Sequence, residues 1–547
     1  MPKRFVASLK AEFAGYNGQK LTKDIMAGIT VAAVALPLAL AFGVGSGATA
    51  AAGMITAIIA GLVIGGLSGA SYQISGPTGA MTAILLTLVQ KYGMNGIFAA
   101  GFFAGIFLIV AGVFRLGRMI SLIPSSVITG FTSGIAIIIA LGQLDNFFGV
   151  TSEGSLAILK FFSYFTSGFS PDLATVGIGL FVIVVMVFWP KKWNAKLPAS
   201  LVSLIFVLIL NRFLQLDVAV VGDIPQTLLL PERLNLGALS FEQFGELLIP
   251  SLSIAALAMI ESLLCGASAG KMKNEKLDGD QELIAQGIGN ILIPFFGGVP
   301  ATAAIARTSV AIKSGAQTRI AGIVHAIVLM LSMFLLAPVM SQIPLSALAG
   351  VLLVTAWRMN DWENIRYIFG NRFRWGMIKF MVTMAATVVL DLTQAIVIGV
   401  TLSACFIVIR MADIDVTVKP VDNKRLARIG IEIDPLPDHV QVAYITGTVF
   451  FGSLERLTQA LDGLDASVLI LSMRGVPTVD LSGVQRLVEI VQEYEKRGAE
   501  VMLASVQPKV LELLQRGGIH SAVNEAHVFP TAAEAIVHAA QEHIAAV

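Results

Sequence analysis

Two similar motifs decide the fold: the sequence ISGPTGA at residues 74–80 and the sequence GGVPATA at residues 297–303. Each motif has glycine before a proline and threonine shortly after it, and each interrupts an apolar stretch. Each proline also lies about fifty residues after the start of an apolar helix, the first helix for Pro77 and the eighth for Pro300. This shared offset indicates two related halves of seven membrane helices each.

The two prolines are expected to begin helices in the middle of the membrane. With an odd number of helices per half, the second half enters from the opposite face, which gives an inverted repeat. Proline is favoured at the first position of a helix, and such a helix end exposes unpaired N–H groups and a positive dipole. Two such ends predict an anion site beside the hydroxyls of Thr78 and Thr302. The alternative is that each motif only kinks an ordinary membrane helix.

The composition predicts that most of the chain lies in a lipid bilayer. Hydrophobic residues make up 56% of the 547 residues and charged residues 13%, against roughly 25% charged in soluble domains. The net charge of +1 gives no indication of nucleic-acid binding. Cys265 and Cys405 lie in apolar stretches, which disfavours disulfides and thiolate metal clusters. Because no nucleophile or nucleotide loop stands out, we expect neither an enzyme nor a cofactor or bound metal.

Fourteen apolar stretches are long enough to cross or half-cross the hydrocarbon region. Some of them, such as those that begin near Pro77 and Ala301, are too short for a full crossing and predict half-helices buried within protein. The stretches lie at residues 25–44, 53–69, 77–91, 95–113, 121–143, 173–189, 198–214, 247–269, 281–293, 301–313, 318–339, 343–357, 376–390 and 393–410.

Basic residues fix the expected orientation of these helices. Lysine and arginine collect in every second connection, on the side shared with the polar lead-in at residues 1–23, which lacks the features of a signal peptide. Both ends are therefore expected in the cytoplasm, with the chain as a multi-pass protein of a bacterial-type inner (plasma) membrane. The basic residues are Arg115, Arg118, Lys191, Lys192, Lys196, Lys271, Lys273, Lys276, Lys313, Arg319, Arg358, Arg366, Arg372 and Arg374.

Two charged residues within the membrane stretches are candidates for function. Glu261 lies near the middle of the eighth stretch, where a carboxylate is costly and functional by default. It predicts coupling to protons, and the alternative is a protonated core glutamate bound to a backbone carbonyl. Cys265 offers sulfur rather than the hard oxygen that sodium prefers, so sodium coupling is disfavoured. Arg307 either reaches a bound anion or extends to the inner surface and serves only the charge pattern.

The C-terminal part changes to alternating strand and helix patterns, which predict a small α/β domain. Asp480 or Ser482 is placed to cap a helix after the second buried strand. A nucleotide site is the weaker interpretation, because no Walker-type loop is present. The expected divisions of the chain are a membrane part at residues 24–411, a linker at residues 412–437 and a cytoplasmic domain at residues 438–547.

Together these motifs resemble the SulP family of anion transporters, called solute carrier family twenty-six in animals. The first motif looks like the family's third-helix signature, and the sequence ELIAQG at residues 282–287, followed by Gly289 and Asn290, looks like its ninth-helix signature. The tail is similar to the STAS domain, named for sulfate transporters and anti-sigma antagonists. The resemblance implies a seven-plus-seven inverted repeat, a core domain that moves against a gate domain, and a homodimer.

The resemblance also implies roles for individual residues. Glu261 would be the coupling-ion residue, although sodium-coupled bicarbonate relatives have Asp and Thr where this chain has Glu261 and Cys265. Arg307 matches the arginine of a tenth-helix Ser-Arg motif, with Ala306 in place of the serine. Leu481 stands where anti-sigma antagonists have a phosphorylatable serine, which disfavours that regulation. The anion site between the third and tenth half-helices would be lined by Thr78, Gly79, Ala80, Ala301, Thr302 and Ala303.

We therefore expect a secondary active transporter of inorganic anions that works by alternating access with protons, and sulfate is the first expectation. Bicarbonate and C4-dicarboxylates remain alternatives, because backbone N–H groups and a helix dipole accept any small anion. A channel-like anion conductance and a regulatory membrane scaffold that transports nothing are the two competing functions.

Overall fold

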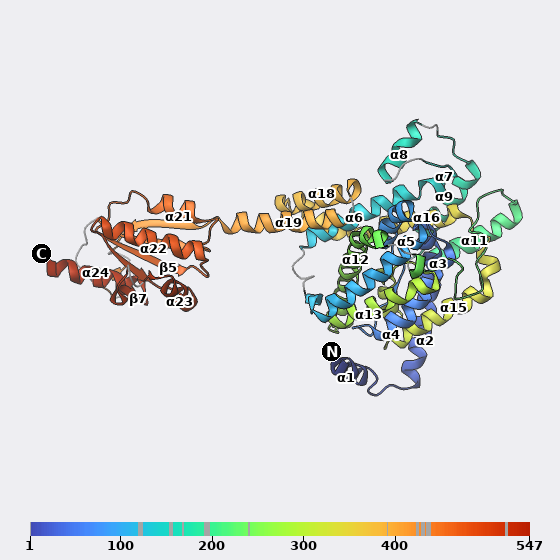
Figure 1. Cartoon of the computed structure of the whole chain (residues 1–547), viewed down its shortest axis with the longest axis horizontal. Coiled ribbons are helices and arrows are strands. Elements are labelled where there is room, and N and C mark those ends of the chain that lie inside the picture. The colour runs from blue at the N-terminus through green and yellow to red at the C-terminus, as the bar shows by residue number, and fades with distance from the viewer. Residues whose placement is uncertain are drawn as a thin grey trace. The chain divides into compact units, whose positions relative to one another are not determined.

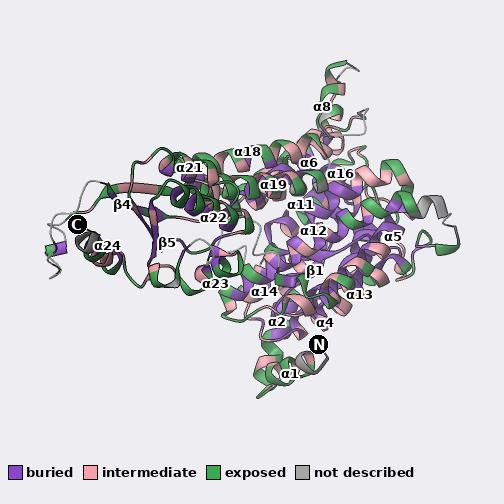
Figure 2. Ribbon diagram, turned by 60° about the vertical axis from the view of Figure 1, so that its left-hand side comes forward, coloured by how far each residue is buried: buried purple, intermediate pink, exposed green. Residues whose placement is uncertain are grey.

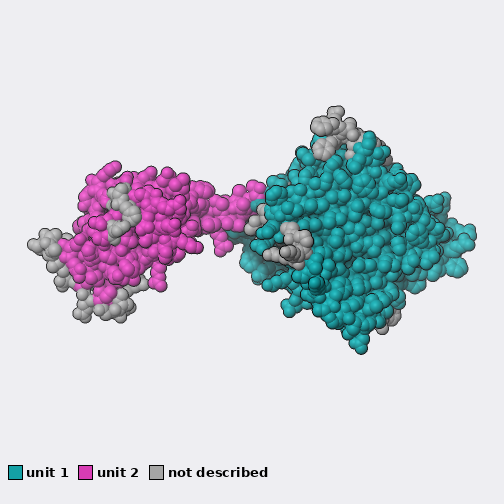
Figure 3. All heavy atoms as spheres, turned by 60° about the horizontal axis from the view of Figure 1, so that its bottom comes forward, with its two compact units in different colours: residues 1–400 teal, residues 401–547 magenta. Residues whose placement is uncertain are grey.

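The computed structural model of the chain forms two compact units, residues 1–400 and residues 401–547 (Figure 3). The residues that it describes are 2–118, 124–152, 157–166, 169–190, 197–238, 241–390, 392–422, 426–427, 431, 433, 439–519 and 523–546. The expected basic residues Lys191, Lys192 and Lys196 lie outside these described residues, as does the expected domain boundary at 437 and 438.

The first half of the membrane unit is almost entirely helical (Figure 1). Asn17 and Thr49 begin two of its helices as N-caps, since their side chains accept the N–H groups of Lys20 and Ala52. Its elements are α1 (Pro2–Glu12), α2 (Gly18–Gly45), α3 (Ala50–Ile59), the π-helical turn η1 (Ala60–Ile64), α4 (Gly65–Leu67), the strand β1 (Ser75–Gly76), α5 (Gly79–Val113), α6 (Ser125–Gly142), α7 (Leu144–Phe148), α8 (Ala157–Thr166), α9 (Leu173–Phe188) and α11 (Ala199–Leu214).

The second half is also almost entirely helical and also contains a two-residue strand that is followed by a helix. Asp278 caps the helix that begins at Gly279 by accepting the N–H of Gln281. The elements are the 3₁₀ turn η3 (Leu236–Ala238), α12 (Phe241–Lys273), α13 (Gly279–Leu292), the 3₁₀ turn η4 (Ile293–Phe296), the strand β2 (Thr302–Ala303), α14 (Ile305–Lys313), α15 (Ile320–Met340), α16 (Leu345–Met359), α17 (Trp362–Gly370), α18 (Arg374–Val389) and α19 (Leu392–Met411).

Helix length and composition confirm a multi-pass helical membrane protein. Six helices within the described ranges are long and apolar enough to cross a bilayer, and four shorter apolar helices accompany them. The expected stretches 77–91 and 95–113 join in α5, which is broken at Gly93 (φ 66°). The exact number of fourteen crossings therefore stays a prediction.

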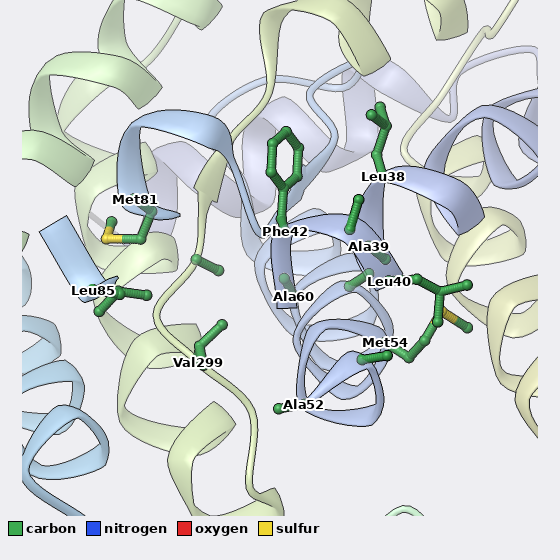
Figure 4. Packing of buried hydrophobic residues seen from close by; sticks show 14 of the residues in the cluster. Leu38, Ala39, Leu40, Phe42, Ala52, Met54, Ala60, Met81, Leu85 and Val299 are labelled. Atoms are coloured by element: carbon green, nitrogen blue, oxygen red, sulfur yellow. The ribbon is translucent and has the colours of Figure 1, made fainter. Parts of the chain in front are cut away.

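Small residues bring the helices of the membrane unit close together. A Cβ on Gly53 would lie 2.0 Å from the carbonyl oxygen of Ala39, and one on Gly105 would lie 2.6 Å from that of Gly287. Such contacts let α2 pack on α3 and α5 pack on α13 with their backbones nearly touching, as is typical of membrane helices. The buried residues are purple in Figure 2, and Figure 4 shows part of this cluster around Phe42.

The polar lead-in is part of the folded unit rather than a loose segment. Residues 2–12 form α1, and Glu12 at its end forms an ion pair of 2.7 Å with Arg319, just before α15. Both side chains are nearly buried, at 7% and 6% exposed. Asp24 in the first turns of α2 accepts the N–H groups of Gln317 and Thr318. The connection before α15 is therefore bound by both Glu12 and Asp24.

The second unit contains a sheet of five strands in the order β3-β4-β5-β6-β7. The strands from β4 to β7 are parallel, which confirms the expected alternation of strands and helices, and β3 is antiparallel to β4. Because β3 lies inside the expected linker at residues 412–437, part of that segment is sheet. The strands are β3 (Asp415–Pro420), β4 (Val440–Thr446), β5 (Val468–Gly475), β6 (Glu500–Ala504) and β7 (Val528–Phe529).

Helices cover both faces of this sheet, as a parallel sheet requires. Leu469 and Leu471 of β5 face one apolar cluster, and Ile470 between them faces another that includes Ile536 of the C-terminal helix. Asp480 caps α22 by accepting the N–H of Gly483 at 2.7 Å. The helices are α21 (Leu454–Leu461), α22 (Leu481–Lys496), α23 (Pro508–Arg516), the 3₁₀ turn η6 (Glu525–His527) and α24 (Ala532–Ala546).

Candidate functional site

The two proline motifs lie side by side in the membrane unit. β1 and β2 pair antiparallel, with Ser75 opposite Ala303 and Gly76 opposite Thr302. More than two hundred residues of sequence separate these partners, so the pairing joins the two halves of the unit. A helix begins directly after each strand, α5 at Gly79 and α14 at Ile305.

The two helix beginnings are built differently. Thr78 caps α5, and its hydroxyl accepts the N–H of Met81 at 3.4 Å. In the second motif the chain stays extended through β2, and Ala304 is the N-cap, without a side-chain hydrogen bond. Pro300 therefore does not begin a helix, in contrast to the sequence prediction, because the ladder with β1 holds the following residues extended.

A cavity of about 460 Å³ opens at these helix beginnings. Its lining includes Thr78 and the next two residues at the start of α5, Glu261 in the middle of α12, and Arg307 in the first turn of α14. Phe42, Phe131 and Ile260 are among the apolar residues around it. A mostly apolar cavity with a few converging polar groups is typical of a small-ligand site.

Thr78 links the start of α5 to the acid in α12. Its hydroxyl donates a hydrogen bond of 2.9 Å to Oε2 of Glu261. Thr78 is 4% exposed, and Glu261 lies on the cavity wall. The carboxyl group therefore faces the place where the N–H groups of α5 point, and its protonation state sets the charge there.

Arg307 turns inward and does not extend to the membrane surface. Its side chain is 1% exposed, and Nη2 donates a hydrogen bond of 2.6 Å to the carbonyl oxygen of Pro77. Among the residues that the structure describes, Nη1 has no hydrogen-bond partner. A Cβ on Gly76 would lie 2.6 Å from this nitrogen, so only glycine leaves room for the guanidinium. A buried cation with a free donor at a cavity wall is suited to hold an anion.

The residues Ala301, Thr302 and Ala303 lie behind the cavity rather than on its lining. All three are fully buried, and their polar groups are used inside the protein. The N–H of Ala301 donates to Oδ1 of Asn290 at 2.7 Å, and the N–H of Ala303 donates to Oγ of Ser262 at 3.2 Å. The next residues along the chain, Ala304, Ile305 and Ala306, line the cavity in their place.

A polar network on α13 holds both strands in position. Gln286 donates from Nε2 to Oγ of Ser75 at 2.9 Å and to Oε1 of Glu282 at 2.8 Å. Asn290 binds Ala301 on the other strand at both its carbonyl and its N–H. Glu282, Gln286 and Asn290 recur every four residues, so they lie on one face of α13. This spacing of polar residues can be read from the sequence, but only the structure shows that they hold the two strands.

The sequence treated Arg358 only as a cytoplasmic charge, but this residue also lines the cavity. It lies in the last turn of α16, and its Nη2 donates to the carbonyl oxygen of Met186 at 2.6 Å. Thr132 of α6 and Thr355 of α16 are on the same wall. Two cations therefore line the cavity, Arg307 on α14 and Arg358 on α16.

The chain is similar to known proteins over most of its length. The profile described as Sulfate permease family matches residues 21–402, and the profile described as STAS domain matches residues 435–535. The putative sulfate transporter YvdB of Bacillus subtilis is 33% identical over 530 residues, which cover 94% of this chain and 97% of the relative. The bicarbonate transporter BicA of Picosynechococcus is 27% identical, with 90% of each chain covered.

Two solved structures show the same fold. The transmembrane domain of a cyanobacterial bicarbonate transporter, BicA, covers 70% of this chain and 98% of its own at a TM-score of 0.65 and 30% identity. Murine solute carrier 26 family member A9, an anion transporter solved in an inward-facing state, covers 98% of this chain and 95% of its own at a TM-score of 0.84. Because the latter is 18% identical, its likeness concerns the fold alone.

Proposed function

The chain belongs to the sulfate permease family and carries a STAS domain, and from this premise we propose that it is a secondary active transporter of sulfate that works by alternating access with protons. Its general function, anion transport across a membrane, follows from the family. The substrate, the coupling ion and the mechanism are proposals that rest on the cavity.

The observation that supports substrate binding best is the free nitrogen of Arg307. A buried guanidinium with an unused donor is costly unless an acceptor reaches it, and a charged oxyanion satisfies it with a strong hydrogen bond. The N–H groups at the starts of α5 and α14 add positive potential at the same cavity. We propose that Thr78, Gly79, Ala80 and Arg307 bind the anion. Ala301, Thr302 and Ala303 then shape the wall behind it.

Charge balance favours sulfate and a proton together. Arg307 and Arg358 bring two positive charges to the cavity, and an ionised Glu261 would add a negative charge beside the anion. A dianion therefore binds better when Glu261 is protonated, and by linkage the proton binds better when the dianion is present. This reciprocity is what symport requires. Protons are proposed rather than sodium, because Cys265 one turn away is a sulfur ligand.

Alternating access is supported by the two sources of the cavity wall. Residues of α5, α12 and α14 line the cavity together with residues of α6 and α16, and we assign these two groups of helices to the two moving parts. Antiparallel pairing of β1 with β2 is the geometry that a two-fold axis in the membrane plane would produce. On this basis we propose fourteen crossings as a seven-plus-seven inverted repeat with a core and a gate domain. A homodimer in the plasma membrane, with both termini cytoplasmic, completes the proposal.

Uptake of labelled sulfate, bicarbonate and succinate into liposomes that hold the purified chain tests this function. Sulfate uptake that increases with an inward proton gradient is expected, with the other two anions as weak competitors. Bicarbonate is the second candidate, because the bicarbonate transporter BicA shares the fold at 30% identity. Large unitary currents that ignore the proton gradient would assign a channel instead. Absence of uptake of all three anions would favour a scaffold.

A further inference from the structure

A second group of ligand-type side chains lies in the STAS domain, outside the unit that contains the cavity. His527 ends the turn η6 just before the edge strand β7, and Glu500 begins the neighbouring strand β6. His538 and Glu542 lie one turn apart on the C-terminal helix α24. Three segments that are distant in sequence thus bring two imidazoles and two carboxylates together.

Two of the distances between these groups are close to the edges of a tetrahedral metal site. Nδ1 of His527 lies 3.1 Å from Oε1 of Glu500, and Nε2 of His538 lies 3.4 Å from Oε1 of Glu542. Ligand atoms of His527, His538 and Glu542 all lie within 4.8 Å of one another. A zinc ion with bonds of about 2.0–2.1 Å separates neighbouring ligand atoms by about 3.3–3.4 Å. Small side-chain rotations therefore suffice to close the site.

Two of the atoms are buried and unsatisfied. Oε1 of Glu500 and Nε2 of His538 have no hydrogen bond to any residue in the described part of the chain, although a nitrogen of His527 and an oxygen of Glu542, respectively, lie close to them. Closeness without hydrogen-bond geometry is what lone pairs aimed at a common ion produce. Burial also raises the pKa of Glu500, and the nearby carboxylate of Glu542 adds to that effect. A divalent cation would relieve both the unsatisfied atoms and the crowding of carboxylates.

The type of ion follows from the ligands. Imidazole nitrogens with carboxylate oxygens suit zinc and similar first-row ions, whereas magnesium and calcium prefer oxygen ligands alone. Phe529 packs against the ring of His538 with ring centroids 5.0 Å apart, which limits the freedom of that imidazole. The carboxylate of Glu542 is the most exposed of the set, at 48%, and leaves an entry path.

We propose that His527, His538, Glu542 and Glu500 bind one divalent transition-metal ion, represented by Zn²⁺, and that this ion fastens α24 to the β6–β7 edge of the sheet. Two of the ligands come from the helix and two from the sheet edge. The ion thus cross-links segments that also pack together through the apolar cluster around Ile536.

Zinc titration of the full-length chain tests the proposal. The protein is purified in detergent, freed of its affinity tag and stripped with a chelator, and Zn²⁺ then competes with a chromogenic chelator. One ion per chain is expected, with affinity reduced by about tenfold or more in His538→Gln and in Glu542→Gln. His439→Gln is the matched control, because His439 also pairs with a carboxylate, Asp465 at 3.7 Å, on an exposed surface. Mg²⁺ should not compete.

Equal zinc affinity in the wild type and in His538→Gln would overturn the proposal, as would the same loss in His439→Gln. Hydrogen exchange gives a second readout that does not depend on transport. Zinc should slow exchange of the amides of α24 in the wild type and leave them unchanged in His538→Gln. Slowing in both proteins would show that the ion binds elsewhere. Because Glu542 is half exposed, Glu542→Gln keeps the test valid if a histidine variant fails to fold.

Discussion

Nη2 of Arg307 donates a hydrogen bond of 2.6 Å to the carbonyl oxygen of Pro77, so the arginine that follows the second motif lies over the proline of the first. Nη1 of the same side chain is buried and has no hydrogen-bond partner among the described residues. One guanidinium thus joins the two halves and offers a donor to the substrate.

Arg307→Gln should weaken sulfate binding. A charged hydrogen bond contributes about 1.5–3 kcal/mol, so the KM for uptake should increase by about tenfold or more. Lys313→Gln removes the same charge from the exposed end of the same helix and serves as the control. Uptake by Arg307→Gln with the KM of the wild type would remove this residue from the site.

Gly76→Ala, in β1, should displace the guanidinium of Arg307. The added Cβ would lie 2.6 Å from Nη1 of Arg307, so the guanidinium must shift from its place. We expect the KM for sulfate to increase while the purified protein keeps its melting temperature within a few degrees. Gly66→Ala is the control, since no atom lies within 4 Å of its added Cβ. An unchanged KM for Gly76→Ala would show that the position of the guanidinium does not matter.

Glu261→Gln should separate anion movement from proton movement. The amide keeps a partner for the hydroxyl of Thr78 but cannot take up a proton. In the wild type, uptake should increase as the external pH falls; in Glu261→Gln it should be independent of pH while sulfate exchange persists. Glu363→Gln, at an exposed acid in the first turn of α17, should behave like the wild type. A pH profile that survives in Glu261→Gln would assign the proton to another group.

Asn290→Ala should destabilise the membrane unit without acting on the anion directly. The substitution leaves the N–H and the carbonyl of Ala301 unpaired in a buried place, at a cost of about 1–3 kcal/mol for each group. The melting temperature in detergent should therefore fall. Asn371→Ala, at an exposed helix end, is the control and should leave it unchanged. A stable Asn290→Ala protein would mean that water or relaxation replaces these bonds.

Glu500→Gln should change how the STAS domain responds to pH when no metal is present. Burial raises the pKa of Glu500 in the folded state, so the folded domain holds a proton more tightly than the unfolded chain. The contribution of this group to stability is therefore full below its unfolded pKa and is lost as the pH rises through the folded value. Glu500→Gln should thus unfold at a higher temperature than the wild type near neutral pH. The gain should shrink as the solution is acidified, and thermal unfolding of chelator-treated protein measures it.

The sequence predicted the class of fold, and it named Thr78, Glu261 and Arg307, which line the cavity, as candidates. Two prolines at matching offsets indicated interrupted helices, and the structure pairs the strands beside them. Thr78 and Glu261 were both candidates, but their hydrogen bond joins residues 183 positions apart and could not be read from spacing. The strand patterns of the tail predicted β4, β5 and β6, because alternating apolar residues between turns carry a strong local signal.

The remaining features depend on tertiary contacts. Nothing local shows that Thr302 and Ala303 form a ladder with β1, so the sequence placed the second helix start too early. β3 was assigned to a linker because its segment carries alternating charges and prolines, and pairing with β4 defines it as a strand. The cluster around His538 went unnoticed because its members come from separate segments. No spacing in the sequence predicts that these side chains come together.

The pairing of Ser75 and Gly76 with Ala303 and Thr302 limits how the transporter can move. Pulling the two helix starts apart would break the bonds between the strands, the contact of Arg307 with Pro77 and the bridges from α13. We therefore expect the two strands and the helices that begin after them to move together as one rigid body that carries the anion. This rigid body, which includes α5, α12 and α14, would then slide against α6 and α16.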